Sequence, residues 1–339
     1  MNEMYRLRVE DSSQVGEVRR RAASMGRMAG LDEVRVEHVS IVVTELATNL
    51  VKHAHGGELL LRMHDAPETP GIEAISLDTG PGINDIGQSL GDGFSTVKSA
   101  GTGLGAIQRL STLFDIYSKP GEGTAVLSII RRDRAAYGRP APHTLDIGVV
   151  CVPVQTERSN GDAWAVYQSP ERALIMVADG LGHGQHAAEA SGAAVAVFRS
   201  HPDSGPKELI ERMHDAMRQT RGAAIAVAEV RWHENMLRYA GVGNISGRVY
   251  GGDTVHNMVS YNGTVGMEMR KIDEFLSPWP KDGLLIMFSD GIATHWNLEE
   301  YPGLQTRHAS LLAGVLFRDH SRMRDDNTVV AVREARSVS

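Results

Sequence analysis

The stretch Leu77-Asp78-Thr79-Gly80-Pro81-Gly82 decides the fold of the first half of the chain. It closes a predicted strand, 72–78, so the carboxylate of Asp78 stands where a strand meets a loop. Gly80 and Gly82 allow the backbone to turn close to a ligand. An aspartate in this place can accept a hydrogen bond from an exocyclic amine, and adenine carries one. The stretch therefore indicates a pocket for a nucleotide base.

A polar pair precedes this stretch on a predicted helix, residues 34–54, whose apolar stripe has the i, i+4, i+7 spacing of a core-facing side. Glu45 and Asn49 are four residues apart and share a face beside the stripe. A carboxylate and a carboxamide there are suited to holding a divalent cation and a hydroxyl near a phosphate. The alternative interpretation is the ordinary polar flank of a buried helix.

A glycine cluster follows, Gly101-Thr102-Gly103-Leu104-Gly105, and it opens a predicted helix that ends at Leu110. The free amides and the positive dipole end of a helix can bind phosphate. The spacing differs from the dinucleotide-binding fingerprint, and the preceding residues 92–100 resemble a loop and not a strand. The cluster favours phosphate binding, with a simple turn as the alternative.

Composition limits the classes of protein and of partner. The chain has 339 residues, of which 42% are apolar and 23% charged, as in folded proteins with room for two domains. Thirty-five basic and 42 acidic side chains give a net charge of -7, so a basic surface for nucleic acid or anionic lipid is not expected. We expect neither class of partner.

The single cysteine, Cys151, excludes an intramolecular disulfide and agrees with a reducing compartment. No apolar stretch approaches the roughly 18 to 20 residues that span a bilayer. The first residues, 1–10, do not form a signal sequence. We therefore expect a cytoplasmic protein.

A charged segment with two prolines, 131–143, lies between apolar runs and marks a domain boundary. We predict domains at 1–131 and 144–339 with a linker at 132–143, and an α+β class with a sandwich of helices and sheet in each half. The predicted elements of the first half are strands 4–9, 59–63, 72–78, 113–118 and 124–130 and helices 12–28, 34–54 and 101–110. Those of the second half are strands 146–154, 163–167, 173–178, 223–231, 236–240, 247–250, 284–289 and 328–332 and helices 185–198 and 206–220.

Acidic side chains recur in the second half where predicted strands meet loops. A single Asp-Gly pair is most often a turn, but several carboxylates at the rim of one sheet cannot all stay ionised without a counter-charge. Divalent metal ions would supply that charge. The four stretches are Asn160-Gly161-Asp162, Val177-Ala178-Asp179-Gly180, Phe288-Ser289-Asp290-Gly291 and Arg324-Asp325-Asp326-Asn327-Thr328.

Oxygen ligands without nearby cysteine favour Mg²⁺ or Mn²⁺. Two such ions about 4 Å apart can hold a phosphate and lower the pKa of a water that attacks phosphorus. Cys151 lies in an apolar strand with no phosphate loop after it, so we predict a packing role. His183, His186 and Glu189 could be considered a zinc site, but His183 falls in a glycine-rich loop, and it could instead contact substrate phosphate or a water.

Taken in order, the motifs of the first half resemble the four sequence boxes of the GHKL (Bergerat) ATPase fold. The resemblance covers about 4–131 and is closest to the small serine kinases of bacterial partner switching, the RsbT and RsbW anti-sigma kinases. The matching motifs are Glu45-x-x-x-Asn49, Asp78-x-Gly80-x-Gly82, Gly101-x-Gly103-x-Gly105 and Gly123-Thr124.

This resemblance implies a kinase site that uses ATP and Mg²⁺. Asn49 would bind the Mg²⁺ that bridges the phosphates, and Glu45 would act as a catalytic base or orient the acceptor serine. Asp78 would recognise adenine, with Thr124 nearby. Two glycines, Gly80 and Gly82, would shape the base pocket. The phosphates would be wrapped by Gly101, Gly103 and Gly105.

The second half, about 144–335, resembles the PPM family of metal-dependent serine/threonine phosphatases in its SpoIIE and RsbX branch. The resemblance implies a site with two Mn²⁺ or Mg²⁺ ions and catalytic carboxylates. Asp179 and the Gly180 carbonyl would bind one metal, and Asp179, Asp290 and Asp325 the other. Asp162 would hold metal-bound waters. A slip of one residue in the last motif leaves Asp326 as the alternative to Asp325.

Together the resemblances imply a bifunctional partner-switching regulator. One half would phosphorylate serine or threonine on a STAS-domain antagonist protein, and the other would remove that phosphate, controlling a sigma-factor or stress-signalling cascade. A downstream phosphatase or a sigma factor would be a further partner, and a monomer and a homodimer are both open. The alternative is an ATP-sensing or partner-sequestering module attached to an active metal-dependent phosphatase.

Overall fold

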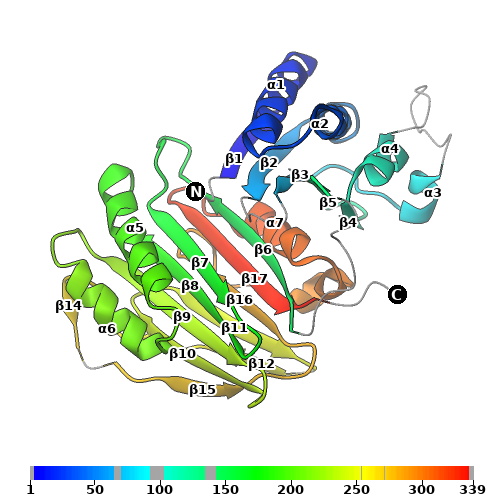
Figure 1. Cartoon of the computed structure of the whole chain (residues 1–339). Coiled ribbons are helices and arrows are strands. Elements are labelled where there is room, and N and C mark those ends of the chain that lie inside the picture. Colours follow the sequence, from blue (N-terminus) through cyan, green and yellow to red (C-terminus); the bar gives the residue numbers. More distant parts are fainter. Residues whose placement is uncertain are drawn as a thin grey trace. The chain divides into compact units, whose positions relative to one another are not determined.

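The computed structural model of the chain (Figure 1) describes residues 4–64, 70–91, 103–133, 143–252, 254–270 and 272–335. It divides into two compact units. Unit 1 contains Met1–Gly138 and Tyr301–Arg318, and unit 2 contains Arg139–Glu300 and Asp319–Ser339. Residues 301–318, which lie within the predicted second domain 144–339, group with unit 1.

Unit 1 is built on a five-stranded antiparallel sheet with the strand order β1-β2-β3-β5-β4. Its strands are β1 (Met4–Val9), β2 (Gly57–His64), β3 (Gly71–Leu77), β4 (Leu113–Lys119) and β5 (Gly123–Arg131). Its helices are α1 (Ser12–Met28), α2 (Glu33–Ala54), α3 (Ile86–Leu90), α4 (Gly103–Leu110) and most of α7 (Ala309–His320), with a short 3₁₀ turn at Leu304–Thr306.

Polar side chains fix the ends of the two long helices. Asp11 begins α1 with a capping box, in which its side chain accepts from Ser13 and the Gln14 side chain accepts from the Asp11 backbone. Asp32 begins α2 by accepting a hydrogen bond from the Arg35 amide. These caps set the register of α2 and so the direction in which its polar face points.

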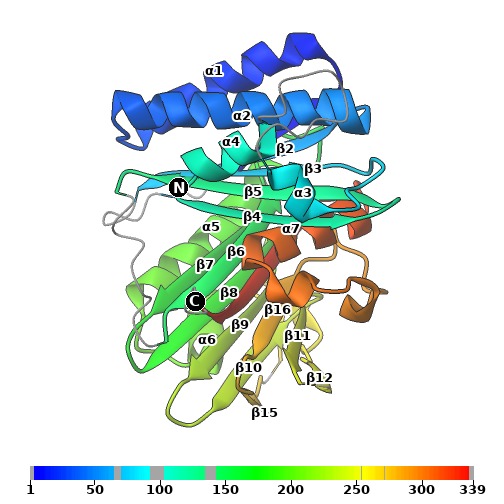
Figure 2. The same cartoon turned by 90° about the vertical axis from the view of Figure 1, so that its right-hand side faces the viewer.

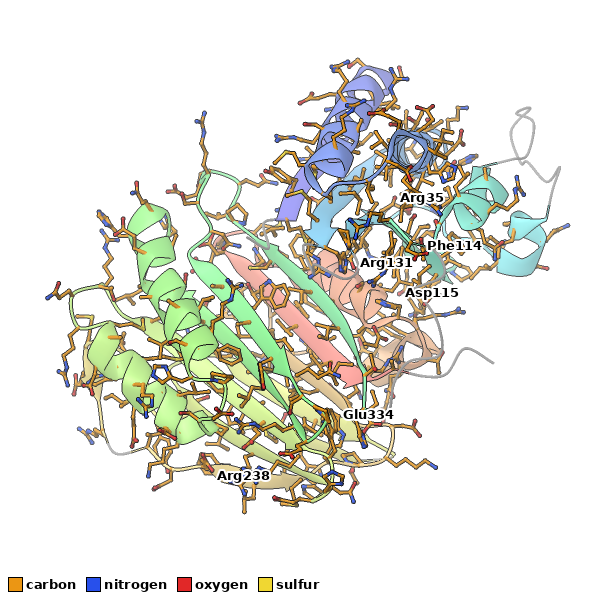
Figure 3. All side chains as sticks on the ribbon, in the orientation of Figure 1. Arg35, Phe114, Asp115, Arg131, Arg238 and Glu334 are labelled. Carbon is orange, nitrogen blue, oxygen red and sulfur yellow. The ribbon has the colours of Figure 1, made fainter. Side chains whose placement is uncertain are left out.

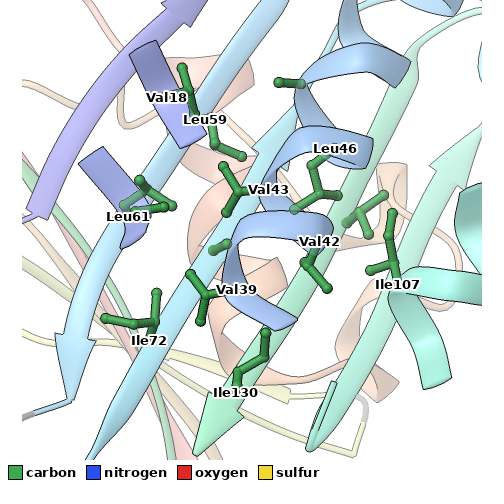
Figure 4. Close-up of a cluster of buried hydrophobic side chains, with 14 of the residues drawn as sticks. Val18, Val39, Val42, Val43, Leu46, Leu59, Leu61, Ile72, Ile107 and Ile130 are labelled. Carbon is green, nitrogen blue, oxygen red and sulfur yellow. The ribbon is translucent and has the colours of Figure 1, made fainter. Parts of the chain in front are cut away.

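One face of the sheet is covered by α1, α2 and α4. The apolar stripe predicted for α2 is buried against the side chains of β2, β3 and β5, as Figure 4 shows. The buried side chains that the figure labels are Val18, Val39, Val42, Val43, Leu46, Leu59, Leu61, Ile72, Ile107 and Ile130.

The other face of the same sheet is covered by α7. A Cβ atom placed on Gly314 would lie 3.2 Å from Ile75 Cγ2 and 3.2 Å from Leu77 Cδ2, so the helix approaches β3 closely at a position that suits glycine. Figure 2 shows α1, α2 and α4 on one side of the sheet and α7 on the other. Unit 1 is therefore a three-layer unit whose third layer comes from late in the sequence.

Unit 2 contains two five-stranded sheets, ordered β15-β10-β9-β8-β7 and β12-β11-β16-β17-β6, and a small two-stranded sheet, β13-β14. Its strands are β6 (Leu145–Val152), β7 (Asp162–Gln168), β8 (Arg172–Gly180), β9 (Ala223–Arg231), β10 (Met236–Val242), β11 (Ser246–Gly251), β12 (Thr254–Asn257), β13 (Gly263–Thr264), β14 (Glu268–Met269), β15 (Phe275–Pro278), β16 (Leu284–Phe288) and β17 (Asn327–Glu334). Its helices are α5 (Gln185–Ser200) and α6 (Pro206–Ala216), with a 3₁₀ turn at Leu298–Glu300.

The two large sheets of unit 2 pack face to face. Val149, Ile175, Tyr239 and Leu285 belong to the buried cluster that the two sheets share. The second cluster joins α5 and α6 to the outer face of the first sheet, through Phe198 and others. The arrangement places the loops that follow β8 and β16 at the ends of buried strands, where the acidic side chains lie.

The predicted α+β class, with a sandwich in each half, is confirmed. Helix α6 ends at Ala216 and not at residue 220, and α7 was assigned no element from the sequence. Within the described ranges, no helix combines the length and the apolar character that crossing a bilayer requires.

Candidate nucleotide and metal sites

The predicted phosphate-binding residues of α2 lie beside the first turn of α4. A Cβ atom on Gly103 would lie 3.4 Å from Glu45 Oε2 and 3.6 Å from Asn49 Oδ1. Both side chains are partly exposed, whereas Gly105, further along α4, is buried. The structure thus brings Glu45, Asn49 and the start of α4 together, which puts a carboxylate, a carboxamide and helix N-terminal amides at one place.

Asp78 is held in place by the backbone at the end of β3. Its Oδ1 accepts hydrogen bonds from the amides of Gly80 at 2.9 Å and Thr124 at 3.1 Å. Within the described residues, Oδ2 has no hydrogen-bond partner, so one oxygen remains for a ligand. Burial raises the pKa of Asp78, and these two amides and Arg318 act against that rise.

The residues around Asp78 are packed too closely for larger side chains. A Cβ on Gly80 would lie 2.8 Å from the Ala54 Cα, and Gly82 has a φ of +69°. The Thr124 hydroxyl is 2.9 Å from Ser118 Oγ, and Ser118 in turn accepts from the Ile83 amide at 2.8 Å. The structure therefore brings Asp78, Gly80 and Thr124 close together, whereas Gly101 and residues 92–96 lie outside the described residues.

Asp162 and Asp179 form the centre of the acidic site in unit 2. They are paired directly opposite each other across β7 and β8. Burial and neighbouring carboxylates raise the pKa of Asp162 to about 7, although Ser289 Oγ donates to its Oδ2 at 2.6 Å. Burial, followed by the charges of Asp162 and Asp290, raises the pKa of Asp179 to about 9. A negative charge on one of these two carboxyl groups therefore disfavours ionisation of the other.

Asp290 joins this group from the loop after β16. Its Oδ2 accepts a hydrogen bond from Asn244 Nδ2 at 2.7 Å. Burial and then Asp325 raise the pKa of Asp290, and Arg322 acts against them. Gly180 ends β8 beside this group, and its amide donates to the Gly161 carbonyl at 3.1 Å.

The structure distinguishes Asp325 from Asp326. Both carboxylate oxygens of Asp326 are engaged, since Oδ1 accepts from the Val154 amide and Oδ2 from the Gly161 amide, each at 2.7 Å. Asp326 is buried and joins the loop before β17 to the loop between β6 and β7. Asp325 is partly exposed and accepts, through Oδ1, only the adjoining amide of Asp326 at 2.9 Å among the hydrogen bonds of the described residues.

The donor set fits divalent metal ions. Its side chains are hard carboxylate oxygens, and their burial and mutual repulsion create a demand for positive charge that Mg²⁺ or Mn²⁺ would meet. In the part of the chain that the structure describes, no three histidine, cysteine or acidic side chains have the geometry needed to hold a metal ion as they stand. Asp179, Asp290 and Asp325 would hold the ions, together with the Gly180 carbonyl.

The histidines considered for zinc have separate partners. His183 Nδ1 lies 2.7 Å from Glu157 Oε1, and His186 Nδ1 lies 3.3 Å from Glu189 Oε2. Cys151 is buried, and this burial raises its pKa to about 12, so the side chain packs as a thiol.

Three roles at the sites were not recognised from the sequence, although Asp326 itself was considered there as a metal ligand. Ser289, buried next to Asp290, donates to Asp162. Asp326 supports the loops through two backbone amides. Arg318 donates from Nη1 to the Asp78 carbonyl at 3.0 Å. A buried serine between an apolar run and Asp-Gly was a local signal for the first, whereas the other two depend on contacts distant in sequence.

Comparisons with known proteins assign both halves. Residues 9–130 match the family model of the histidine kinase-like ATPase domain, and residues 169–334 match that of stage II sporulation protein E. The chain is 30% identical over 129 residues to the serine/threonine-protein kinase RsbT of Bacillus subtilis, covering 38% of this chain and 97% of RsbT. It is 29% identical over 85 residues to the phosphoserine phosphatase RsbX of the same organism, covering 25% of this chain and 43% of RsbX.

Solved structures agree with the fold. A chain from the structure described as the bacterial stressosome, a modular system adapted to control secondary messenger signaling, is 25% identical and has a TM-score of 0.53, with coverage of 56% of this chain and 100% of that chain. RsbX in complex with magnesium is 18% identical with a TM-score of 0.51, covering 58% of this chain and 98% of that chain. The chain thus belongs to the RsbT family through its histidine kinase-like ATPase domain, and it continues into a SpoIIE-type PPM phosphatase domain similar to RsbX.

Proposed function

We propose that the chain is a bifunctional partner-switching regulator of the cytoplasm. It transfers the γ-phosphoryl group of ATP to serine or threonine on a STAS-domain antagonist protein and hydrolyses phosphate from the same class of site. The observation that carries the proposal is that Glu45 and Asn49 lie together at the start of α4 in a chain that also gathers Asp162, Asp179 and Asp290.

The kinase reaction uses the residues around α4. Asp78 accepts a hydrogen bond from the adenine amine through Oδ2, because its Oδ1 is already engaged by two backbone amides. Amides at the start of α4 bind phosphate oxygens. Mg²⁺ held by Asn49 would neutralise phosphate charge. Glu45 accepts the proton of the acceptor hydroxyl as it attacks phosphorus, or orients that hydroxyl.

The phosphatase reaction uses the carboxylates of unit 2. Two Mg²⁺ or Mn²⁺ ions would stabilise phosphate charge and make water nucleophilic at neutral pH. Asp179, Asp290, Asp325 and the Gly180 carbonyl would hold them. Asp162 orients water, and Ser289 holds its carboxylate in place by donating to Oδ2. Asp326 keeps these loops in register and does not bind metal.

The substrate class rests on similarity to RsbT and RsbX, which are a serine/threonine-protein kinase and a phosphoserine phosphatase. A STAS-domain protein is the phosphoacceptor that this pairing favours, and a sigma-factor or stress-signalling cascade is the output, with a downstream phosphatase or sigma factor as the released partner.

The test is transfer of label from γ-labelled ATP, with Mg²⁺, to a purified STAS-domain protein. The wild-type chain is compared with Asp290→Asn, in which dephosphorylation cannot hide the product, and with Glu45→Ala combined with Asp290→Asn. Label should accumulate with Asp290→Asn and disappear in the double variant. If ATP binds and no chain labels the STAS protein, the kinase assignment is wrong.

A sensor function is the second candidate, and the hydrogen bond from Arg318 to the Asp78 carbonyl favours it. If the chain is a sensor, ATP changes the rate of dephosphorylation, and no label from γ-labelled ATP is transferred to protein. The Glu45→Ala chain separates the two, because a sensor keeps its ATP-dependent output and a kinase loses it.

A further inference from the structure

The segment 301–318 departs from the order of the sequence. It lies between Asp290 and Asp325, both of unit 2, yet it is part of unit 1. The chain leaves unit 2 after Glu300 and returns to it at Asp319. The segment is therefore the part of the phosphatase half that contributes directly to the ATP-binding unit.

The beginning of the segment is fixed on β4 through Asp115, which Figure 3 labels. Arg307 Nη1 donates to Asp115 Oδ1 at 3.2 Å, and the His308 amide donates to Asp115 Oδ2 at 2.7 Å. Both oxygens of one carboxylate thus hold the entry to α7, and this anchor is formed by a charge-assisted pair and a helix-start amide.

The middle of the segment is packed against β3. Ser310 Oγ donates to Glu73 Oε2 at 2.9 Å, and Glu73 also pairs with Arg62 at 2.9 Å. All three side chains are buried. One turn later Gly314 approaches Ile75 and Leu77, as described above, and the residue after Leu77 is Asp78. Movement of the end of β3 would therefore require movement of α7, since interiors are close-packed.

The end of the segment reaches the nucleotide site itself. Arg318 Nη1 donates to the Asp78 carbonyl at 3.0 Å. The backbone of Asp78 is also held through its amide, which donates to the Thr124 carbonyl at 3.0 Å. Arg318 therefore helps to fix the backbone that presents the base-binding carboxylate.

The residues that follow Arg318 are bonded, within unit 2, to the loop that carries Asp290. The Ala293 amide donates to the His320 carbonyl, and the Arg322 amide donates to the Gly291 carbonyl, each at 2.8 Å. Ser321 and Ile292 form a β-bridge between these bonds. The Arg322 charge also acts on Asp290. A short run of chain thus connects the peptide of Asp78 to the peptide that follows Asp290.

We infer that Arg318 is a positioning residue that couples the nucleotide site at Asp78 to the metal site at Asp290 through residues 318–322. The inference rests on the proposed function of both sites. A nucleotide that binds better when Arg318 is bonded to Asp78 favours that arrangement, and it thereby favours one register of 320–322 on 291–293. The coupling is reciprocal, so metal at Asp290 changes nucleotide affinity by the same factor.

The experiment uses the full chain and a non-hydrolysable ATP analogue with Mg²⁺. Binding is measured by fluorescence, hydrolysis of p-nitrophenyl phosphate with Mn²⁺ gives kcat/KM, and hydrogen exchange follows the amides of Ala293 and Arg322. Arg318→Met removes the donor and keeps an apolar stem, Arg318→Lys keeps a donor, and Arg212→Met, on the exposed face of α6, is the matched control for loss of an arginine.

In the wild type and the control, saturating analogue should change kcat/KM by about fivefold or more and should change exchange at Ala293 and Arg322 even without Mn²⁺. In Arg318→Met the ratio of kcat/KM with and without analogue should be near one, and Arg318→Lys should restore it in part. The inference is overturned if the wild type binds the analogue but its kcat/KM is the same with and without it. It is also overturned if Arg318→Met shows the same ratio of kcat/KM values as the wild type. Failure to bind nucleotide or to hydrolyse the phosphate ester would instead contradict the proposed function.

Discussion

Asp162 and Asp179 face each other directly across β7 and β8, and each raises the electrostatic cost of ionising the other. Like charges placed opposite each other in a sheet are destabilising. Folding has therefore placed a buried carboxyl group, Asp162, opposite a half-buried one, Asp179, where the pair by itself reduces stability, which is the arrangement expected of a site that is completed by cations.

The Asp179→Asn variant should separate this cost from function. Without metal it should be about 1 kcal/mol more stable than the wild type, because one repelling carboxyl group is removed. Mn²⁺ should raise the Tm of the wild type and leave that of the variant nearly unchanged. Thermal unfolding with and without Mn²⁺ checks both statements. A variant that Mn²⁺ stabilises as strongly as the wild type would show that Asp179 does not hold metal.

Asp325 and Asp326 should respond differently to the same change. Asp326→Asn loses one of two buried backbone hydrogen bonds and should lower the free energy of unfolding by about 1–3 kcal/mol. Asp325→Asn should leave the metal-free stability near that of the wild type and lower phosphatase activity by at least about 100-fold. Urea unfolding and a phosphate-release assay measure the two effects. If instead Asp325→Asn lowered the stability and Asp326→Asn lowered only the activity, Asp326 would be the metal ligand and Asp325 the residue that supports the loops.

The nucleotide site makes a prediction about affinity. Asp78→Asn keeps Oδ1 as the acceptor for the Gly80 and Thr124 amides but loses the charged acceptor for the base amine, a contact worth about 1.5–3 kcal/mol. Its Kd for ATP should rise by about 10- to 150-fold. Asp85→Asn, in which the changed side chain caps the neighbouring short helix α3, is the control and should keep the wild-type Kd. Equal affinity of Asp78→Asn and the wild type would exclude Asp78 from base recognition.

The buried ion cluster under α7 predicts how unit 1 responds to acid. Burial lowers the pKa of His64 below its ordinary 6.5. Burial alone would raise the pKa of Glu73, but Arg62 and His64 hold it well below its ordinary 4.5. Both folded-state values are depressed, so both groups contribute stability at neutral pH that is lost on acidification, first below about pH 6.5 and then below about pH 4.5.

Glu73→Gln should reveal the share of the carboxylate. The groups that face His64 and Glu73 are Arg62 and Ser310, with the charges of Arg131 and His308 nearby. The variant should be less stable than the wild type at pH 7 and should lose less stability between pH 5 and pH 3.5. Urea unfolding at each pH measures the free energy of unfolding of both proteins. Parallel curves for the two proteins would rule out a linked Glu73 ionisation.

The sequence predicted the elements whose apolar residues recur with a clear helical or strand period. Helix α7 was missed for a physical reason. Helix α2 has one apolar stripe because one side faces the sheet, whereas residues 309–317 are buried throughout and so have no stripe. Strands β3 and β5 are buried along almost their whole length, as strands covered on both faces are, although Glu73, Ser76 and Ser128 interrupt their apolar sequences. They did not identify the covering segment, because the contact between Gly314 and Leu77 joins residues far apart in the chain.

The site shows the same limit. Motifs predicted roles for Asp78, Asp162, Asp179 and Asp290, because each lies where a strand meets a loop. The choice between Asp325 and Asp326 required the amides of Val154 and Gly161, which only the folded chain brings to Asp326.

The central claim is that one chain adds and removes the same phosphate, and a two-step assay tests it most directly. The Asp290→Asn chain first labels a STAS-domain protein with γ-labelled ATP, and after removal of ATP the Glu45→Ala chain is added with Mn²⁺. The account predicts that the label is placed in the first step and released as inorganic phosphate in the second. Label that is never placed, or that remains on the protein after the second step, would contradict it.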